Sequence, residues 1–203
     1  MARRDSLSLT ITQPLNLIHT IESGQAFRWK RHGEWYFGVI RNNLIALRQY
    51  ESQLDVRSSP SPPEQIEQEL RDYLRLDDDL SMIYSCIDKD PYINRAISEY
   101  HGLRILRQDP WECLISFICS ANSNIPRISA SMNAIAKSYG LPLTLDKHVD
   151  YSFPTPTALA CAGETELRKL KLGFRAKYVA KAAERVASGE IELEPLRHVE
   201  YEE

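Results

Sequence analysis

The chain has 203 residues, of which 43% are hydrophobic and 26% are charged, so it can bury a sizeable core and does not have the composition of a disordered protein. No apolar run approaches the roughly 18 residues of a membrane span, and the N-terminus lacks the apolar segment of a secretory signal. The net charge of −3 argues mildly against nucleic acid as a partner.

The first sixty residues are predicted to form an antiparallel meander of strands. The segment AFRWKR alternates with a period of two, which places Phe27 and Trp29 on one face and Arg28 on the other. Turn residues follow at HG and at RNN, and the segments EWYFGVI and LIALRQY between and after them are predicted strands. The prolines of residues 58–64 end the sheet.

From residue 64 onward the apolar period becomes helical. Asp90 followed by Pro91 is typical of a helix start, and Asp109 followed by Pro110 repeats the pattern with a glutamate at the capping-box position. A further helix runs to Gly140, and two or three more follow in the last third of the chain.

These patterns predict an α+β protein. We expect a β-rich N-terminal domain with flanking helices over residues 1–97 and an α-helical domain over residues 98–203. Residues 101–182 carry 11 basic and 6 acidic side chains, so a basic segment lies within an acidic protein. This asymmetry fits a surface for a polyanion, although a solvated helical face is the favoured explanation.

The four cysteines form no CxxC pair, so neither a zinc site nor an iron–sulfur cluster is suggested. We expect free, buried thiols in a reducing compartment.

Three segments could carry chemistry, and each also has a purely structural explanation. SGQAFRW, at residues 23–29, is a turn before a strand, or a place where Gly24 lets the backbone approach a ligand. SANSNIPRI, at residues 120–128, is an interhelical loop or a recognition corner. KLKLGFRAKY, at residues 169–178, surrounds an aromatic ring with basic residues, which suits either a solvated helix start or contact with phosphates and bases.

Together these segments resemble the 8-oxoguanine DNA glycosylase family, in the helix–hairpin–helix superfamily of base-excision repair enzymes. The blocks SGQAFRW, LRQDPWECLISFICSANSNIPRI and LRKLKLGFRAKYV occur in the family's order and spacing, and the resemblance covers residues 20–182. It implies a twisted antiparallel N-terminal domain, a helical domain, and excision of 8-oxoguanine opposite cytosine by base flipping, with AP lyase activity.

The resemblance also implies roles for individual residues. Gly24 matches the residue whose carbonyl accepts a hydrogen bond from N7–H of the lesion, which normal guanine lacks. Arg127 and Arg175 match the two arginines that read the unpaired cytosine, and Asn122 matches the asparagine that fills the space of the extruded base. Phe174 stands where members of the family carry tyrosine, so its ring can still wedge beside the cytosine but a hydroxyl contact is lost.

The family's catalytic lysine and aspartate belong to a helix–hairpin–helix with a PGVG-like turn, and none of the eight lysines of this chain lies in such a context. We therefore assign no catalytic residue, and we expect an incomplete helix–hairpin–helix domain that is inactive alone.

The alternatives are a non-catalytic module or truncated fragment that binds damaged DNA, and an unrelated α+β protein. The resemblance implies a monomer that needs no cofactor or metal and binds duplex DNA containing 8-oxoguanine opposite cytosine rather than a membrane. It would act inside the cell, in the cytoplasm and nucleoid of a prokaryote or in the nucleus of a eukaryote.

Overall fold

The computed structural model describes residues 6–199, and the chain divides into two compact units. The first unit contains the residues up to Arg107 together with Leu143–Val149, and the second contains Gln108–Pro142 and the residues from Asp150 onward. The predicted division into domains between residues 97 and 98 stays a prediction.

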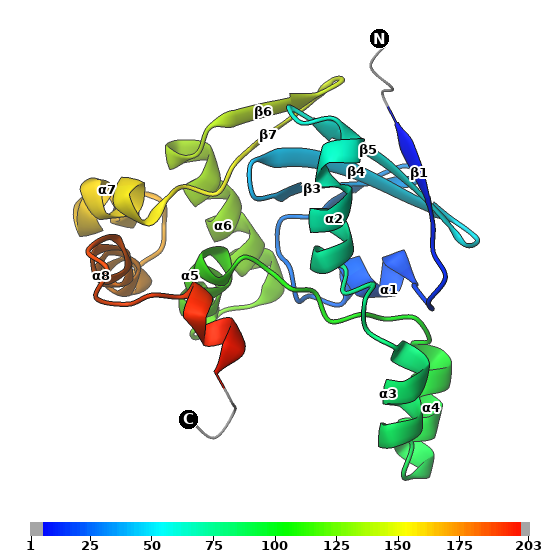
Figure 1. Ribbon diagram of the computed structural model, residues 1–203. Coiled ribbons are helices and arrows are strands. Elements are labelled where there is room, and N and C mark those ends of the chain that lie inside the picture. Colours follow the sequence, from blue (N-terminus) through cyan, green and yellow to red (C-terminus); the bar gives the residue numbers. More distant parts are fainter. Residues whose placement is uncertain (1–5, 200–203) are drawn as a thin grey trace. The chain divides into compact units, whose positions relative to one another are not determined.

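The first unit is built on a five-stranded antiparallel sheet (Figure 1). Its strands are β1 (Leu7–Thr10), β2 (Lys30–His32), β3 (Trp35–Ile40), β4 (Asn43–Tyr50) and β5 (Gln53–Ser59). The spatial order is β1-β5-β4-β3-β2, so β2 to β5 form the predicted meander and β1 returns to pair with β5, with Leu9 opposite Leu54. The predicted α+β class, with its sheet near the N-terminus, is confirmed.

The segment between β1 and β2 differs from the prediction. Helix α1 (Leu17–Glu22) lies where only strands were expected, and the carboxamide of Asn16 caps it by accepting from the backbone N–H of His19 at 3.0 Å. The strand predicted to begin at AFRWKR begins only at Lys30. Arg28, expected on the face opposite Phe27 and Trp29 of a strand, is 3% exposed and lies in an irregular segment. The side chain of Gln25 in this segment bonds to the backbone of Arg104 and Leu106.

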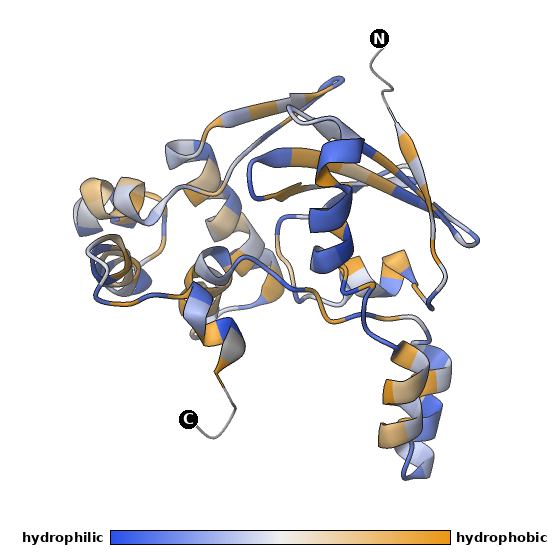
Figure 2. Ribbon diagram, viewed as in Figure 1, coloured by the Kyte–Doolittle hydropathy of each residue, from blue (hydrophilic) through white to orange (hydrophobic). Residues whose placement is uncertain are grey.

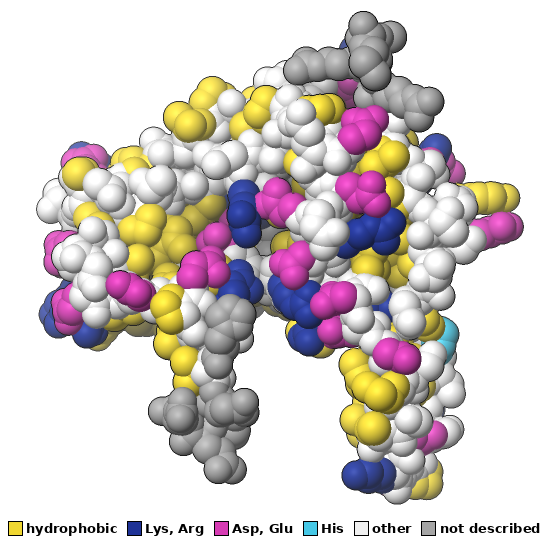
Figure 3. All heavy atoms as spheres, viewed as in Figure 1, with side chains coloured by type: hydrophobic (Ala, Val, Ile, Leu, Met, Phe, Trp, Pro, Cys, Tyr) yellow, Lys and Arg dark blue, Asp and Glu magenta, His cyan; other side chains and the backbone are white. Residues whose placement is uncertain are grey.

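Helix α2 (Pro63–Tyr73) covers one face of the sheet. Its residues Ile66 and Leu70 pack in one apolar cluster with Leu47, Leu54 and Val56 of the strands, because the helical stripe and the alternating strand residues face each other. Around α2 the acidic and basic side chains are interspersed, so this face carries no extended field of one sign (Figure 3).

Helices α3 (Leu80–Ile87) and α4 (Pro91–Glu99) follow α2 in the first unit. The predicted cap is confirmed, since the Asp90 carboxylate accepts from the N–H groups of Tyr92 and Ile93. Leu80 is the one buried residue of α3, and α4 buries none. Much of α3 is apolar along its length (Figure 2).

The second unit is helical. Its elements are α5 (Pro110–Ser120), α6 (Ile125–Tyr139), α7 (Pro156–Lys169), α8 (Arg175–Ala187) and the 3-10 helix η1 (Glu194–His198). The predicted start at Asp109 is confirmed, because its carboxylate accepts from the N–H of Glu112 at 2.9 Å. Helix α7 is kinked at Gly163, whose φ is 70° and ψ is 174°.

A hairpin of β6 (Pro142–Leu145) and β7 (His148–Tyr151) was not predicted. Leu143 and Leu145 point to one side and pack with Phe37, Leu44 and Ala46 of the sheet in the first unit. The segment LPLTL has the strand period, but four residues are too few to distinguish a strand from a loop by pattern alone.

Among the described residues, no helix is both long and apolar enough to cross a membrane. All four cysteines are free, as predicted, but only Cys119 is buried. Burial raises the pKa of its thiol to about 11, so this sulfur remains protonated. The expectation of burial is wrong for Cys86, Cys113 and Cys161, which lie at exposed positions.

Candidate functional site

The segment between α5 and α6, residues 121–124, makes a tight corner. Helix α5 ends at Ser120, and Asn122 then takes a positive φ of 50°, a conformation that asparagine tolerates better than most residues. The Asn124 carboxamide accepts from the N–H of Arg127 at 3.0 Å and caps α6. Pro126 lies in the first turn of the helix, where its missing N–H leaves no bond unmade.

Arg175, the first residue of α8, forms hydrogen bonds with the backbone of this corner. Its Nε and Nη2 donate to the carbonyl oxygens of Ala121 and Asn122, each at 2.8 Å, and its Nη1 donates to the carbonyl of Leu172 at 3.3 Å. Only 8% of Arg175 is exposed. A guanidinium carries five N–H groups, so these three bonds leave donors over for a further acceptor.

The other predicted residues of this unit lie at the surface. Phe174 is 51% exposed, and the Arg175 guanidinium lies 4.9 Å from the centre of its ring. Asn122 and Arg127 are exposed, and neither side chain makes a hydrogen bond or ion pair with the described residues. The corner therefore presents an amide and a guanidinium to solvent.

The structure thus places three of the predicted residues around one guanidinium. Arg175 bonds to the carbonyl of Asn122 and lies over the ring of Phe174, and Arg127 lies in the first turn of the helix that follows the corner. Sequence patterns did not indicate that Arg175 is buried, because two of its three carbonyl partners lie more than fifty residues earlier in the chain.

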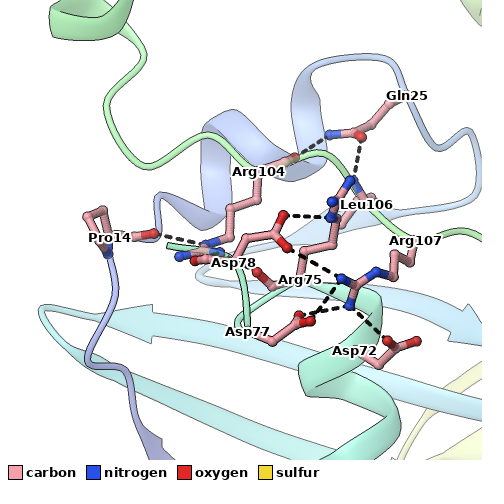
Figure 4. A network of polar contacts seen from close by, with 9 residues as sticks. All are labelled: Pro14, Gln25, Asp72, Arg75, Asp77, Asp78, Arg104, Leu106 and Arg107. Carbon is pink, nitrogen blue, oxygen red and sulfur yellow. Dashed lines mark hydrogen bonds and ion pairs between the residues drawn. The ribbon is translucent and has the colours of Figure 1, made fainter. Parts of the chain in front are cut away.

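Gly24 lies in the first unit, directly after α1. It is half-buried and its φ is 81°, a value that glycine adopts without strain. The next residue, Gln25, fixes the turn. Its Oε1 accepts from the N–H of Leu106 and its Nε2 donates to the carbonyl of Arg104, both at 2.8 Å (Figure 4). Its Nε2 also donates to the carbonyl of Thr20 at 3.0 Å.

The sequence patterns did not indicate that Gln25 is a positioning residue. Its partners lie about eighty residues away, and no local pattern indicates them. Its side-chain amide satisfies the carbonyl of Arg104 and the N–H of Leu106, so it fixes this irregular segment to a distant part of the backbone.

The segment to which Gln25 bonds, residues 104–106, is held in place by Arg104 and Arg107. Arg104 is 1% exposed, and its guanidinium donates to the carbonyls of Pro14 and Arg75; burial lowers its pKa. Arg107 donates through both terminal nitrogens to Asp77, at 2.8 Å each, and to Asp72 at 2.9 Å (Figure 4). These bonds lower the pKa of Asp77 and raise that of Arg107.

Within the described residues, no group of three or more His, Cys, Asp or Glu side chains is arranged to hold a metal ion. What the predicted residues offer is therefore hydrogen bonding, charge and an exposed ring, a set suited to a polyanion with aromatic bases.

Comparison with known families gives two matches that together span nearly the whole chain. Residues 7–114 match the model described as 8-oxoguanine DNA glycosylase, N-terminal domain. Residues 115–200 match the model described as HhH-GPD superfamily base excision DNA repair protein.

Individual proteins are similar over the same region. The N-glycosylase/DNA lyase OGG1 of Arabidopsis thaliana is 38% identical over 179 residues, which cover 85% of this chain and 48% of that protein. The N-glycosylase/DNA lyase of Saccharomyces cerevisiae is 32% identical over 194 residues, covering 88% of this chain and 51% of that protein. The chain thus spans about half the length of these curated relatives.

Among solved structures, the Clostridium acetobutylicum 8-oxoguanine glycosylase/lyase in complex with double-stranded DNA containing cytosine opposite 8-oxoguanine has a TM-score of 0.89. It is 29% identical, and the match covers 97% of this chain and 67% of that one.

Proposed function

Because the chain belongs to the 8-oxoguanine DNA glycosylase family, we propose that its residues recognise 8-oxoguanine opposite cytosine in duplex DNA. In the whole protein, this recognition would serve excision of the base and cleavage of the strand at the abasic site, as the names of the relatives indicate. A DNA substrate would place the protein in the compartment that holds the genome. We also propose that the protein acts as a monomer.

Gly24 is proposed to recognise the lesion. Oxidation at C8 places a hydrogen on N7 of guanine, so an acceptor in normal guanine becomes a donor in 8-oxoguanine. A backbone carbonyl accepts from that donor and repels the lone pair of the normal base. The bonds of Gln25 to Arg104 and Leu106 support this role, because they hold the turn of Gly24 before any DNA is bound.

The α5–α6 corner is proposed to recognise the partner base. Extruding the lesion leaves cytosine with its N3 and O2 acceptors unpaired, and arginine N–H groups can donate to both. Arg127 is proposed to supply one set of donors and Arg175 its remaining ones. Asn122 would occupy part of the vacated space, and the exposed ring of Phe174 would wedge beside the cytosine.

One observation carries the proposal more than any other. Arg175 is buried, and its guanidinium donates to the carbonyls of Ala121 and Asn122 in the α5–α6 corner. These bonds satisfy carbonyls that the end of α5 leaves without a helical partner, and they also hold the corner in place, which favours a recognition element because it is ordered before binding.

We propose further that residues 1–203 by themselves bind the lesion but do not excise it. None of the eight lysines lies in the motif that the family uses for attack on the sugar. The alternative of a non-catalytic damaged-DNA-binding module rests on the same observation.

Binding and chemistry can be tested separately. We expect the 203-residue chain to bind a duplex with 8-oxoguanine opposite cytosine more tightly than the same duplex with guanine, as measured by fluorescence anisotropy. Equal affinity for both duplexes would refute the proposed recognition.

Borohydride trapping then tests the chemistry. We expect no covalent complex with the 203-residue chain, and a trapped complex with a chimera that continues into the C-terminal half of the Arabidopsis relative. A covalent complex formed by residues 1–203 alone would mean that one of their lysines is a nucleophile.

A further inference from the structure

A basic groove runs along α6 and the loop after α7 in the second unit. It has a volume of about 540 Å³ and is lined by Arg127, Ala130, Ser131, Ala134, Lys169, Leu170 and Lys171. Three of these side chains are cationic and none is acidic. The small side chains of α6 let a ligand approach the helix closely.

The cations of the groove are only partly neutralised. Lys169 pairs with Glu166 at 2.6 Å between Nζ and Oε1. Arg127 and Lys171 are exposed, and their charged groups make no ion pair or hydrogen bond with the described residues. An anion in the groove would therefore meet two uncompensated positive charges from different elements, one from α6 and one from the loop.

The backbone of Lys171 provides a second, independent observation. Helix α7 ends with Leu170 as its C-cap, and Lys171 follows with a φ of 62°. Glycine is the usual residue at this place, because a side chain is strained in the left-handed region. Gly173, two residues later, has the same φ. Lys171 keeps a positive charge in the groove at a conformational cost. Residues with a strained backbone of this kind are found more often at binding sites.

We propose that this groove binds a backbone phosphate of the DNA strand that carries the cytosine opposite the lesion. The proposal rests on the proposed function, in which Arg127 reads that cytosine. Arg127 also lines the groove, and for this reason we assign the phosphate to the strand that carries this cytosine. Phosphate contacts of this kind fix the register of a protein on DNA without reading its sequence.

The variant Lys171→Gly tests the charge without a risk of unfolding. Glycine relieves the positive φ, so its melting temperature should equal or exceed that of the wild type. Loss of one phosphate contact should make the slope of the logarithm of the association constant against the logarithm of the salt concentration less negative by about 0.9. Between 50 and 200 mM salt, the variant's affinity should therefore fall by a factor about 3.5 times smaller than that of the wild type. Lys171→Arg should keep the wild-type slope.

The control is Lys89→Gln, which removes one exposed positive charge from the segment between α3 and α4 in the first unit. It should leave the slope unchanged. An unchanged slope in Lys171→Gly, or an equal change in both variants, would overturn the proposal.

Uncharged methylphosphonate linkages identify the strand. Placed beside the cytosine, they should abolish the difference between wild type and Lys171→Gly, and placed beside the lesion they should preserve it. The reverse pattern would refute the assignment to the cytosine strand. Failure of the proposed function itself would look different, as equal wild-type affinity for 8-oxoguanine and guanine opposite cytosine.

Discussion

Replacing Arg175 with alanine should damage both stability and opposite-base recognition. The substitution removes three hydrogen bonds to the carbonyls of Ala121, Asn122 and Leu172. Hydrogen bonds from a charged group contribute about 1.5–3 kcal/mol each. Water can replace the guanidinium at Ala121 and Asn122, which are exposed, so the loss there is smaller. We expect the free energy of unfolding to fall by about 2–4 kcal/mol.

Arg127→Ala is the matched control, since it removes the same chemical group from an exposed position without a partner among the described residues. Its effect on the free energy of unfolding should stay within about 0.5 kcal/mol. If Arg127 donates to the unpaired cytosine, this variant should still lose about 1–3 kcal/mol of discrimination between cytosine and adenine opposite the lesion.

Urea unfolding followed by circular dichroism gives the stabilities, and anisotropy titrations with cytosine or adenine opposite 8-oxoguanine give the discrimination. Arg175→Lys separates the contribution of the positive charge from that of the hydrogen-bond geometry. An ammonium keeps the charge but cannot donate to two carbonyls in the planar arrangement of a guanidinium. It should recover little of the lost stability. Equal stability of wild type and Arg175→Ala would refute the argument that this side chain holds the corner.

Three further predictions concern the first unit. Gly24→Ala should cost about 1–2 kcal/mol of stability from its φ of 81°, and should weaken excision of 8-oxoguanine by a catalytically complete chimera more than binding to an abasic site, which has no base to read. An unchanged excision rate in the folded variant would remove Gly24 from the lesion site. Gln25→Leu should reduce the preference for 8-oxoguanine over guanine in anisotropy titrations, since the turn loses its bonds to the backbone of residues 104–106; an unaltered preference would contradict this. Arg107→Gln should destabilise the fold at pH 7. The pKa of Asp77 is lowered in the folded state, so its contribution is present above the unfolded value of about 3.9 and is lost as pH falls through the folded value. Urea unfolding at pH 7 and pH 3 should therefore show a smaller difference at pH 3, and a constant difference would refute the assignment.

Local sequence determined much of the framework. The starts of α4, α5 and α6 follow from an Asp or Asn cap with proline in the first turn, and the meander follows from alternating apolar residues between turn signals. The family also follows from sequence, since its motifs lie in contiguous blocks. These features depend on residues within a few positions of each other, which is the range over which patterns are informative.

Only the tertiary structure decided how the candidate residues are held. The irregular segment around Gly24 is held by the bonds of Gln25 to backbone about eighty residues later, which no local period indicates. Arg175 looks like a surface residue in a basic stretch, but the carbonyls at the end of α5 make it a buried support. A polar side chain can be buried only where distant groups satisfy its hydrogen bonds, and the positions of those groups are set by the packing of the whole unit.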